Sequence, residues 1–307
     1  MPWPMSRAPP VSASDELFAA QRPRLIGLAY RLLGSVVDAE DVVQEAWVRW
    51  NNANRDELLS PGAWLTTVVS RLGIDRLRAR QRDQSTYVGP WLPEPLISSG
   101  DDPAAAAELS DSLTTAFLVL LERLSPNERL VLLLADVFQQ PFATVAEVIG
   151  KSEDATRQLA VRARRKVRTT EDAAARRPPE RAEQLAIARD FVAAVAEGDE
   201  KRVCELLTSE SVLVSDGGAN RHAARRPVVG PQRIARFLIN LARRFAAVNS
   251  VRFEPTWING APGLIVAIDD QPYWVAAIDV RDGKVDRFFV MVNPDKLTSL
   301  GHRVDLV

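Results

Sequence analysis

Apolar residues recur at three- and four-residue spacing through most of the first 170 positions, which is the pattern of amphipathic helices packed on a shared core. Over residues 15–84 this pattern predicts a small helical bundle. Ser60 and Pro61 give its third helix a capping residue and a proline at the first helical position. Helices resume near residue 104, and the run Ser125-Pro126-Asn127-Glu128 predicts a capping box that opens an apolar helix over 126–138.

The segment from 144 to 168 has the pattern of a helix-turn-helix motif. A short helix near 144–149 is followed by the turn Gly150-Lys151 and by Ser152, which caps a longer basic helix. The spacing predicts a buried face of Thr156, Ala160, Ala163 and Val167 and an outer face of Arg157, Gln158, Val161 and Arg162. Arginine and glutamine can bind guanine and adenine in the major groove, and Arg164 and Arg165 can neutralise phosphates. A solvated basic helix without a partner is the alternative.

After about residue 184 the hydrophobic period changes to that of short strands. Helices over 184–197 and 231–246 flank strand-like runs, and Asp282-Gly283 between the last two runs is a hairpin signal. We therefore predict a multidomain chain whose last part is an α+β domain with a curved antiparallel sheet and helices on one side. The predicted divisions are a disordered N-terminus (1–14), a helical domain (15–84), a linker (85–103), a second helical domain (104–172), a second linker (173–183) and the α+β domain (184–307).

The formal net charge of −1 hides two strongly basic segments. Residues 71–82 hold five arginines against one aspartate, and residues 157–168 hold six basic residues and no acid. Such segments attract polyanions. Cys204 is the only cysteine, so an intramolecular disulfide and a cysteine-rich metal site are excluded, and no cofactor is expected. No apolar run approaches the ~20 residues that span a bilayer, which favours a cytoplasmic protein with no membrane partner.

A short acidic stretch, DAEDVVQE at 38–45, indicates a binding partner different from that of the basic segments. Its polar side chains Asp38, Asp41, Gln44 and Glu45 do not favour phosphate contact, so they indicate a protein partner with a positive groove. Ordinary acids on a helix surface are the alternative.

Three stretches together resemble bacterial extracytoplasmic-function sigma factors: GSVVDAEDVVQEAWVRW (34–50), PGAWLTTVVSRLGIDRLRAR (61–80) and the helix-turn-helix over 125–167. The resemblance covers about 15–170 and implies sigma region 2 followed by sigma region 4. It implies that the acidic motif docks on the β′ coiled coil of core RNA polymerase and that region 4 reads the −35 promoter element. It also implies that the basic helix of region 2 melts and reads the −10 element through Arg71, Asp75, Arg76, Arg78 and Arg80.

The linker contains YVGPWLPEP at 87–95, which combines two aromatic residues with three prolines and is stiffer than a flexible spacer. Tyr87, Trp91 and Leu92 can bury apolar area, so we expect a docking strip; a rigid spacer is the alternative. A nonapeptide of this form is similar to that of sigma factors with a SnoaL-like (NTF2-like) C-terminal domain, which tunes sigma activity within the same chain.

Two C-terminal motifs extend the same resemblance and imply interdomain regulatory contacts. They are Asp216, Gly217 and Gly218 in DGGAN, and Asn293, Pro294, Asp295, Lys296 and Leu297 in NPDKL. Ala219 and Asn220 depart from the family pattern of a third glycine and a lysine. If that lysine makes an ion pair or ligand contact, this chain lacks it or supplies it from a neighbour such as Arg221. Each motif can also be read as an ordinary turn.

The chemistry of the C-terminal domain is left open by the sequence. Acid–base candidates are Asp216, His222, Tyr273, Asp279 and Asp286, but their spacing selects no pair, and we expect no enzyme activity. An unknown small ligand could be sensed by a pocket lined by Trp257, Trp274, Phe288 and Phe289, although an aromatic core would give the same pattern. The sequence therefore predicts a self-regulated sigma factor that binds core polymerase and promoter DNA. The alternative is a DNA-binding regulator fused to a SnoaL-like sensor or enzyme.

Overall fold

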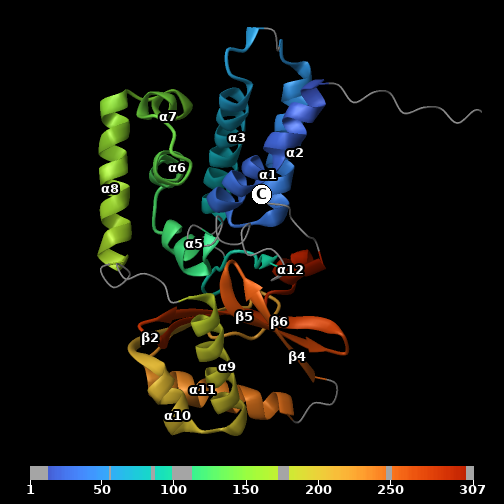
Figure 1. Ribbon diagram of the computed structural model, residues 1–307, viewed down its shortest axis with the longest axis vertical. Coiled ribbons are helices and arrows are strands. Elements are labelled where there is room, and N and C mark those ends of the chain that lie inside the picture. The colour runs from blue at the N-terminus through green and yellow to red at the C-terminus, as the bar shows by residue number, and fades with distance from the viewer. Residues whose placement is uncertain are drawn as a thin grey trace, which may run out of the picture.

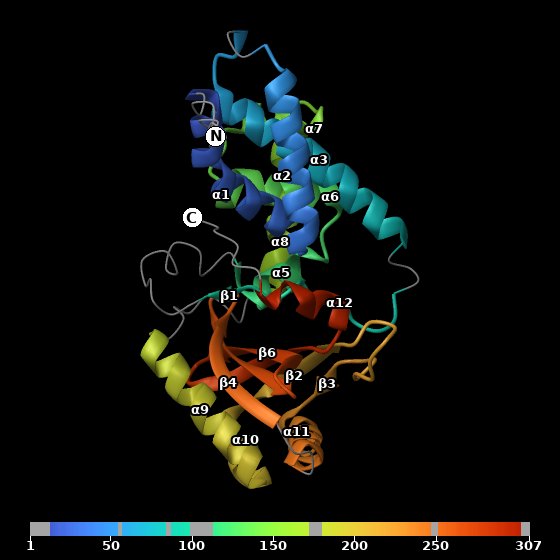
Figure 2. The same cartoon turned by 90° about the vertical axis from the view of Figure 1, so that its right-hand side faces the viewer.

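The computed structural model describes residues 13–54, 57–83, 87–98, 113–171, 180–246 and 251–301, and the predicted N-terminal disorder lies almost entirely outside these ranges. Two helical bundles form one end of the molecule, and an α+β domain forms the other (Figure 1). The linker between the bundles passes across the boundary between these two ends (Figure 2).

The first bundle consists of α1 (Ala13–Leu33), α2 (Val36–Asn52) and α3 (Pro61–Asp83). Ser35 caps α2 by accepting a hydrogen bond from the backbone N–H of Asp38. The third helix begins at Pro61, as its cap-and-proline signal predicts. Apolar residues of all three helices are buried in one cluster.

The second bundle consists of α5 (Thr115–Leu121), α6 (Pro126–Leu132), the π-helix η3 (Leu133–Val137), α7 (Phe142–Ile149) and α8 (Glu153–Glu171). The predicted capping box is present, since Ser125 and Glu128 bond each other's backbone N–H. The predicted helix over 126–138 changes to π geometry in its last part. Gly150 ends α7 with φ of 67°, a left-handed conformation that glycine adopts without strain.

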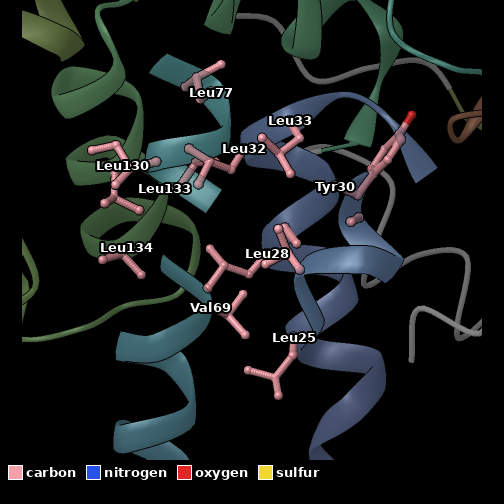
Figure 3. Close-up of a cluster of buried hydrophobic side chains, with 14 of the residues drawn as sticks. Leu25, Leu28, Tyr30, Leu32, Leu33, Val69, Leu77, Leu130, Leu133 and Leu134 are labelled. Carbon is pink, nitrogen blue, oxygen red and sulfur yellow. The ribbon is translucent and has the colours of Figure 1, made fainter. Parts of the chain in front are cut away.

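The two bundles share a single hydrophobic core. In Figure 3, Leu28 and Leu32 of α1 point toward Val69 of α3 and toward Leu130 and the leucines after it in the second bundle. All of these side chains are almost completely buried. Because the apolar surface is common to both bundles, separating them would expose it to water, and the hydrophobic effect holds them together.

The C-terminal domain places helices on one face of a seven-stranded sheet. The helices on that face are α9 (Arg181–Glu197), α10 (Glu200–Leu206) and α11 (Pro231–Ala246). The domain's own strands are β2 (Leu207–Asp216), β3 (Val228–Val229), β4 (Val251–Ile258), β5 (Ala261–Ile268), β6 (Gln271–Arg281) and β7 (Lys284–Met291). The short α12 (Pro294–Leu297) and the 3-10 helix η4 (Thr298–Gly301) follow.

The strand order is β1-β4-β5-β6-β7-β2-β3, and the sheet is mixed. The prediction of an antiparallel sheet is wrong for β2 and β7, which pair in parallel. A parallel pair needs a long crossover, and here that connection contains α11 and four strands, β3 to β6. The Asp282-Gly283 hairpin is confirmed: both residues have positive φ, 51° and 71°, as a tight turn between β6 and β7 requires.

The linker contributes a strand of its own to the C-terminal sheet. This strand, β1 (Ile97–Ser98), pairs antiparallel with the end of β4. On the face of the sheet away from α9–α11, Leu92 packs with Ile258 and Phe289, and Ala116 and Val119 of α5 join the same cluster. The linker and the start of the second bundle therefore cover the sheet face that the C-terminal helices leave open.

Candidate functional sites and the interdomain junction

The outer face of α8 is where the sequence predicts it. Arg157, Gln158, Val161, Arg162 and Arg165 are exposed. The opposite face, with Thr156, Ala160, Ala163 and Val167, is buried against the second bundle. An exposed basic helix face that follows a tight glycine turn has the geometry of a recognition helix for the major groove of DNA.

The arginines of α8 differ in how firmly they are held. Arg157 pairs with Glu153 and lies 4.9 Å from the Phe142 ring centre, and Arg164 forms a bidentate pair with Asp136 at 2.5 and 2.9 Å. Within the described part of the chain, Arg162 and Arg165 make no ion pair. These two guanidinium groups are thus available to a polyanion without breaking an internal contact.

The acidic motif lies along the exposed side of α2. Asp41, Gln44 and Glu45 face solvent, while Asp38 is less exposed and receives Arg76 at 2.6 and 2.9 Å. Arg76 also reaches Asp41 at 3.2 Å. The structure adds three exposed apolar residues of α2 that sequence reasoning missed: Val37, Trp47 and Val48. Apolar contacts next to charges are typical of protein interfaces, so this face suits a protein partner better than a purely acidic surface would.

Three of the arginines expected to bind the −10 element contact the second bundle instead. Arg71 donates to the backbone oxygen of Glu147 at 3.0 Å, Arg78 bonds Asn127 at 3.0 Å, and Arg80 pairs with Glu122 at 3.0 Å. The other two predicted residues also have internal partners, since Arg76 binds the acids of α2 and Asp75 pairs with Arg78. In this arrangement the whole predicted set is engaged within the protein.

A buried ion pair strengthens the contact between the bundles. Arg129 is almost completely buried, lies 2.6 Å from Glu122, and donates to the backbone oxygens of Leu121 and, across the boundary, Leu32. Burial raises the pKa of Glu122, but the charges of Arg129 and Arg80 outweigh that effect and hold it below 4.5. Glu122 is therefore ionised between two arginines, one from each bundle.

Asp216 connects the linker to the C-terminal domain. This fully buried carboxylate accepts hydrogen bonds from the Tyr87 hydroxyl (2.6 Å), the Leu92 N–H (2.8 Å) and the Gly218 N–H (3.0 Å), and it pairs with Lys296 at 2.8 Å. Asn293 completes the cluster by donating to the Tyr87 hydroxyl at 3.0 Å. We call the contacts among Tyr87, Leu92, Asp216, Asn293 and Lys296 the linker lock.

Lys296 is buried together with its partner. Its ammonium group also donates to the Leu92 carbonyl at 2.5 Å and lies 4.0 Å from the Trp91 ring centre. Burial lowers the pKa of Lys296 to about 8, in spite of the opposing attraction of Asp216. Burial, followed by the hydrogen bond to Asp216 and the charge of that carboxylate, raises the pKa of Tyr87. Each charged or polar group of the lock thus depends on the others for its stability inside the protein.

The remaining motif residues have structural positions in the same junction. Asn293 caps α12, Pro294 is in its first turn, Leu297 is buried and Asp295 is exposed. A Cβ at Gly217 or at Gly218, whose φ is +58°, would clash, so neither position accepts a side chain without rearrangement. Arg221, the neighbour named as a possible substitute for the missing family lysine, lies over the Tyr273 ring at 4.2 Å. The cation that pairs with Asp216 is Lys296 of the NPDKL motif.

Trp91 joins the lock to the first bundle. Its ring is so close to Gly34 that a Cβ at that glycine would lie 2.5 Å from it, and Arg80 stacks over the ring at 4.3 Å. Since Lys296 lies over the same ring at 4.0 Å, the indole is in contact with one cation from the first bundle and one from the C-terminal domain.

A second set of polar contacts, around Glu94, was not predicted from the sequence. Glu94 accepts a hydrogen bond from the N–H of Val36, which is the first residue of α2, and burial raises the pKa of Glu94. The Tyr30 hydroxyl donates to the Glu94 carbonyl oxygen at 2.6 Å and accepts from the Asn259 amide at 2.8 Å. Residues from the first bundle, the linker and the C-terminal domain therefore meet at one buried point.

The acid–base candidates of the C-terminal domain do not share one site, although the charge of Asp286 acts on Asp279. Asp216 is part of the linker lock, His222 is exposed, and Asp286 is held by Arg281 at 2.8 Å and Thr208 at 2.7 Å. Burial raises the pKa of Asp279 to about 6. Within the described ranges, no cluster of three or more histidine, cysteine or acidic residues could hold a metal ion.

The four aromatic residues suggested as a ligand pocket do not line one cavity. Trp274 and Phe288 pack beneath the helices, whereas Phe289 belongs to the opposite face of the sheet. Trp257 lies under the guanidinium of Arg181 at 3.9 Å. The alternation of side chains along β7 separates Phe288 from Phe289, so that pocket prediction is wrong. Among the described helices, none combines the length and apolar character needed to cross a membrane.

Comparison with known proteins identifies the class of protein. The family models Sigma-70 region 2 and Sigma-70, region 4 match residues 17–83 and 114–167. The ECF RNA polymerase sigma factor SigJ of Mycobacterium tuberculosis is 41% identical over 290 residues, which cover 92% of each chain. This chain belongs to the extracytoplasmic-function sigma factors, the proteins that direct RNA polymerase to promoters. The first bundle is region 2 and the second bundle is region 4.

The individual relatives extend the similarity into the C-terminal domain. A crystal structure of SigJ from Mycobacterium tuberculosis matches with a TM-score of 0.74 and 39% identity, covering 93% of this chain and 99% of that one. The probable sigma factor SigI of the same species (strain H37Rv) is 32% identical over 300 residues, covering 96% of this chain and 98% of the relative. The predicted order of two all-α sigma domains followed by an α+β domain is confirmed.

Proposed function

We propose that the C-terminal domain controls this sigma factor by holding regions 2 and 4 together. The observation that carries the proposal is that Arg71, Arg78 and Arg80 of region 2 bind region 4, while the linker between these regions is held by Asp216 and Lys296. DNA cannot use these arginines until the regions separate. The C-terminal domain opposes that separation because it binds both the linker and α5.

Run-off transcription with bacterial core polymerase tests this proposal. A chain ending near Glu171 is expected to give more promoter-selective transcript than the full-length protein at equal concentration, because it lacks Asp216, Asn293 and Lys296, the residues that hold the linker. Transcript that requires core polymerase in both cases also distinguishes a sigma factor from a conventional DNA-binding regulator. Equal transcript from the two chains would contradict control by the C-terminal domain.

We propose that the exposed face of α2 docks on the β′ coiled coil of core polymerase. The face combines the acidic residues Asp41 and Glu45 with the apolar residues Val37 and Val48. Such a surface is complementary to a groove that is positively charged and also offers apolar contacts. Because its proposed partners are RNA polymerase and promoter DNA, we propose that the protein acts in the cytoplasm. The acid–base candidates do not form one site, which supports a regulatory rather than a catalytic role for the C-terminal domain.

Reversing the charge of two residues tests the α2 face. Asp41→Lys with Glu45→Lys is expected to weaken binding to core polymerase by roughly tenfold or more, because two attractive charges become repulsive. Fluorescence anisotropy with labelled protein gives the affinity, and circular dichroism checks the fold. Glu210→Lys, an exposed change on the C-terminal domain, is the control. If both proteins bound core polymerase equally well, the docking face would lie elsewhere.

We propose that α8 reads the −35 element through Arg157, Gln158, Val161 and Arg162, with phosphate contacts from Arg164 and Arg165. Arg162→Gln is expected to weaken binding of the holoenzyme to a −35 promoter by roughly tenfold, the value of one good base contact. The measurement is promoter binding at fixed salt concentration. Arg202→Gln on α10 serves as the control. A promoter affinity unchanged by Arg162→Gln would exclude Arg162 from recognition.

A further inference from the structure

A polar cavity of about 130 Å³ lies between the linker and the loop after β2. One wall is Val88–Pro90, and the other is formed by residues of the segment from Ser215 to Arg225. The two segments run side by side at the edge of the molecule (Figure 2). The cavity is separate from the aromatic core of the C-terminal domain and from the DNA-facing helix.

The cavity has a strongly one-sided charge. Arg221, His222 and Arg225 line it, and no carboxylate does. The nearby Asp216 carboxylate belongs to the linker lock, where it already accepts from four donors. Within the described ranges, the side chains of His222 and Arg225 have neither a hydrogen-bond nor an ion-pair partner. The Arg225 guanidinium, with no carboxylate in the lining beside it, and the His222 imidazole favour an anion in this polar hollow.

We propose that this cavity binds a small phosphate-bearing anion. Its volume exceeds that of several water molecules, which leaves room for a phosphate group and a short substituent. Arginine binds phosphate in a bidentate manner, and histidine donates a hydrogen bond in either charge state. Gly217 and Gly218 contribute to the lining of the same cavity.

The bound anion would connect the loop to the linker. Gly89, with φ of +80°, is so near that a Cβ there would lie 3.6 Å from the Cα of Arg225. The cavity wall at Val88–Pro90 directly follows Tyr87 of the linker lock. A ligand that contacts both walls favours the state in which they are together, so the anion would stabilise the docked linker. Binding itself does not rest on the proposed control of transcription, whereas its regulatory effect does.

Isothermal titration of the full-length protein with inorganic phosphate, at constant ionic strength, tests the site. Arg225→Gln is expected to bind roughly tenfold more weakly than the unchanged protein, the value of one charge-assisted hydrogen bond. Arg226→Gln is the matched control, because Arg226 is the exposed neighbour that does not line the cavity. Glycerol 3-phosphate in a parallel titration distinguishes a phosphate ester from free phosphate as the preferred ligand.

Amide hydrogen exchange gives the second readout. Saturating phosphate is expected to slow exchange at Val88 and Gly89 in the unchanged protein and in Arg226→Gln. Absence of saturable binding, or equal loss of binding in the two variants, would overturn the site. Binding without slower exchange at the linker would overturn its placement between the two walls. If phosphate bound as expected while truncation left transcription unchanged, the site would stand and the proposed function would fail.

Discussion

Replacing Asp216 with asparagine is expected to release the linker from the C-terminal domain. The substitution removes the charge that compensates Lys296 while that ammonium group stays buried, and breaking such a pair costs about 3–5 kcal/mol. Hydrogen exchange at Leu92, whose N–H bonds to Asp216, should therefore become at least roughly a hundredfold faster. Promoter-selective transcription with core polymerase should rise because region 2 and region 4 separate more easily.

Asp295→Asn is the control for this experiment, since Asp295 belongs to the same motif but is exposed. A double-mutant cycle with Lys296→Met measures the interaction energy of the ion pair. The loss of protection at Leu92 in the double variant should be smaller than the sum of the losses in the two single variants. Protection at Leu92 that stayed the same in Asp216→Asn and Asp295→Asn would show that the linker is held by other contacts.

Replacing Arg129 with methionine is expected to give the largest loss of stability in the helical half of the protein. The change leaves the backbone oxygens of Leu32 and Leu121 without their buried donor and removes one of the two cations beside Glu122. We expect the free energy of unfolding to fall by about 3–5 kcal/mol. Urea denaturation followed by helical circular dichroism gives the value.

Arg162→Met, a change of the same type at an exposed position that makes no ion pair in the described part of the chain, should stay within about 0.5 kcal/mol of the unchanged protein. Arg129→Lys keeps the positive charge but lacks the planar guanidinium group, so its loss of unfolding free energy should lie between the losses of the other two variants. A loss below about 1 kcal/mol for Arg129→Met would show that the shared apolar core alone holds region 2 to region 4.

The same ion pair makes the contact between regions 2 and 4 sensitive to acid. Because the folded pKa of Glu122 lies below its ordinary 4.5, its contribution to stability is present above that pH and is lost as pH falls through the folded value. Acid titration should therefore lower the stability of the unchanged protein more steeply below pH 4.5 than that of Glu122→Gln.

The helices were predictable because their evidence is local. The buried and exposed faces of α8 follow directly from residues three and four positions apart, and the start of α3 follows from Ser60 and Pro61. The parallel pairing of β2 with β7 was missed because the two strands are separated by most of the C-terminal domain. Hydrophobic period identifies a strand but does not select its partner.

The junction was predictable only in part. Family motifs pointed to Tyr87, Asp216 and Lys296, but not to the ion pair that joins the last two. Tyr30 and Asn259 carry no local signal of function, since a tyrosine in a helix and an asparagine before a glycine have ordinary structural explanations. Their hydrogen bond joins residues from opposite ends of the chain, so only the folded structure brings them together. The assignments to polymerase and promoter contacts remain predictions for the experiments above.

The order of synthesis gives the linker lock a consequence in time. Regions 2 and 4 are complete on the ribosome once Glu171 has been made, but the lock requires Lys296, near the end of the chain. At about 5–20 residues per second, the stretch between them takes on the order of ten seconds to translate. During that interval the nascent sigma regions have no C-terminal domain to restrain them. If the C-terminal domain controls the sigma regions as we propose, each new molecule passes through a brief unrestrained stage before Lys296 completes the linker lock.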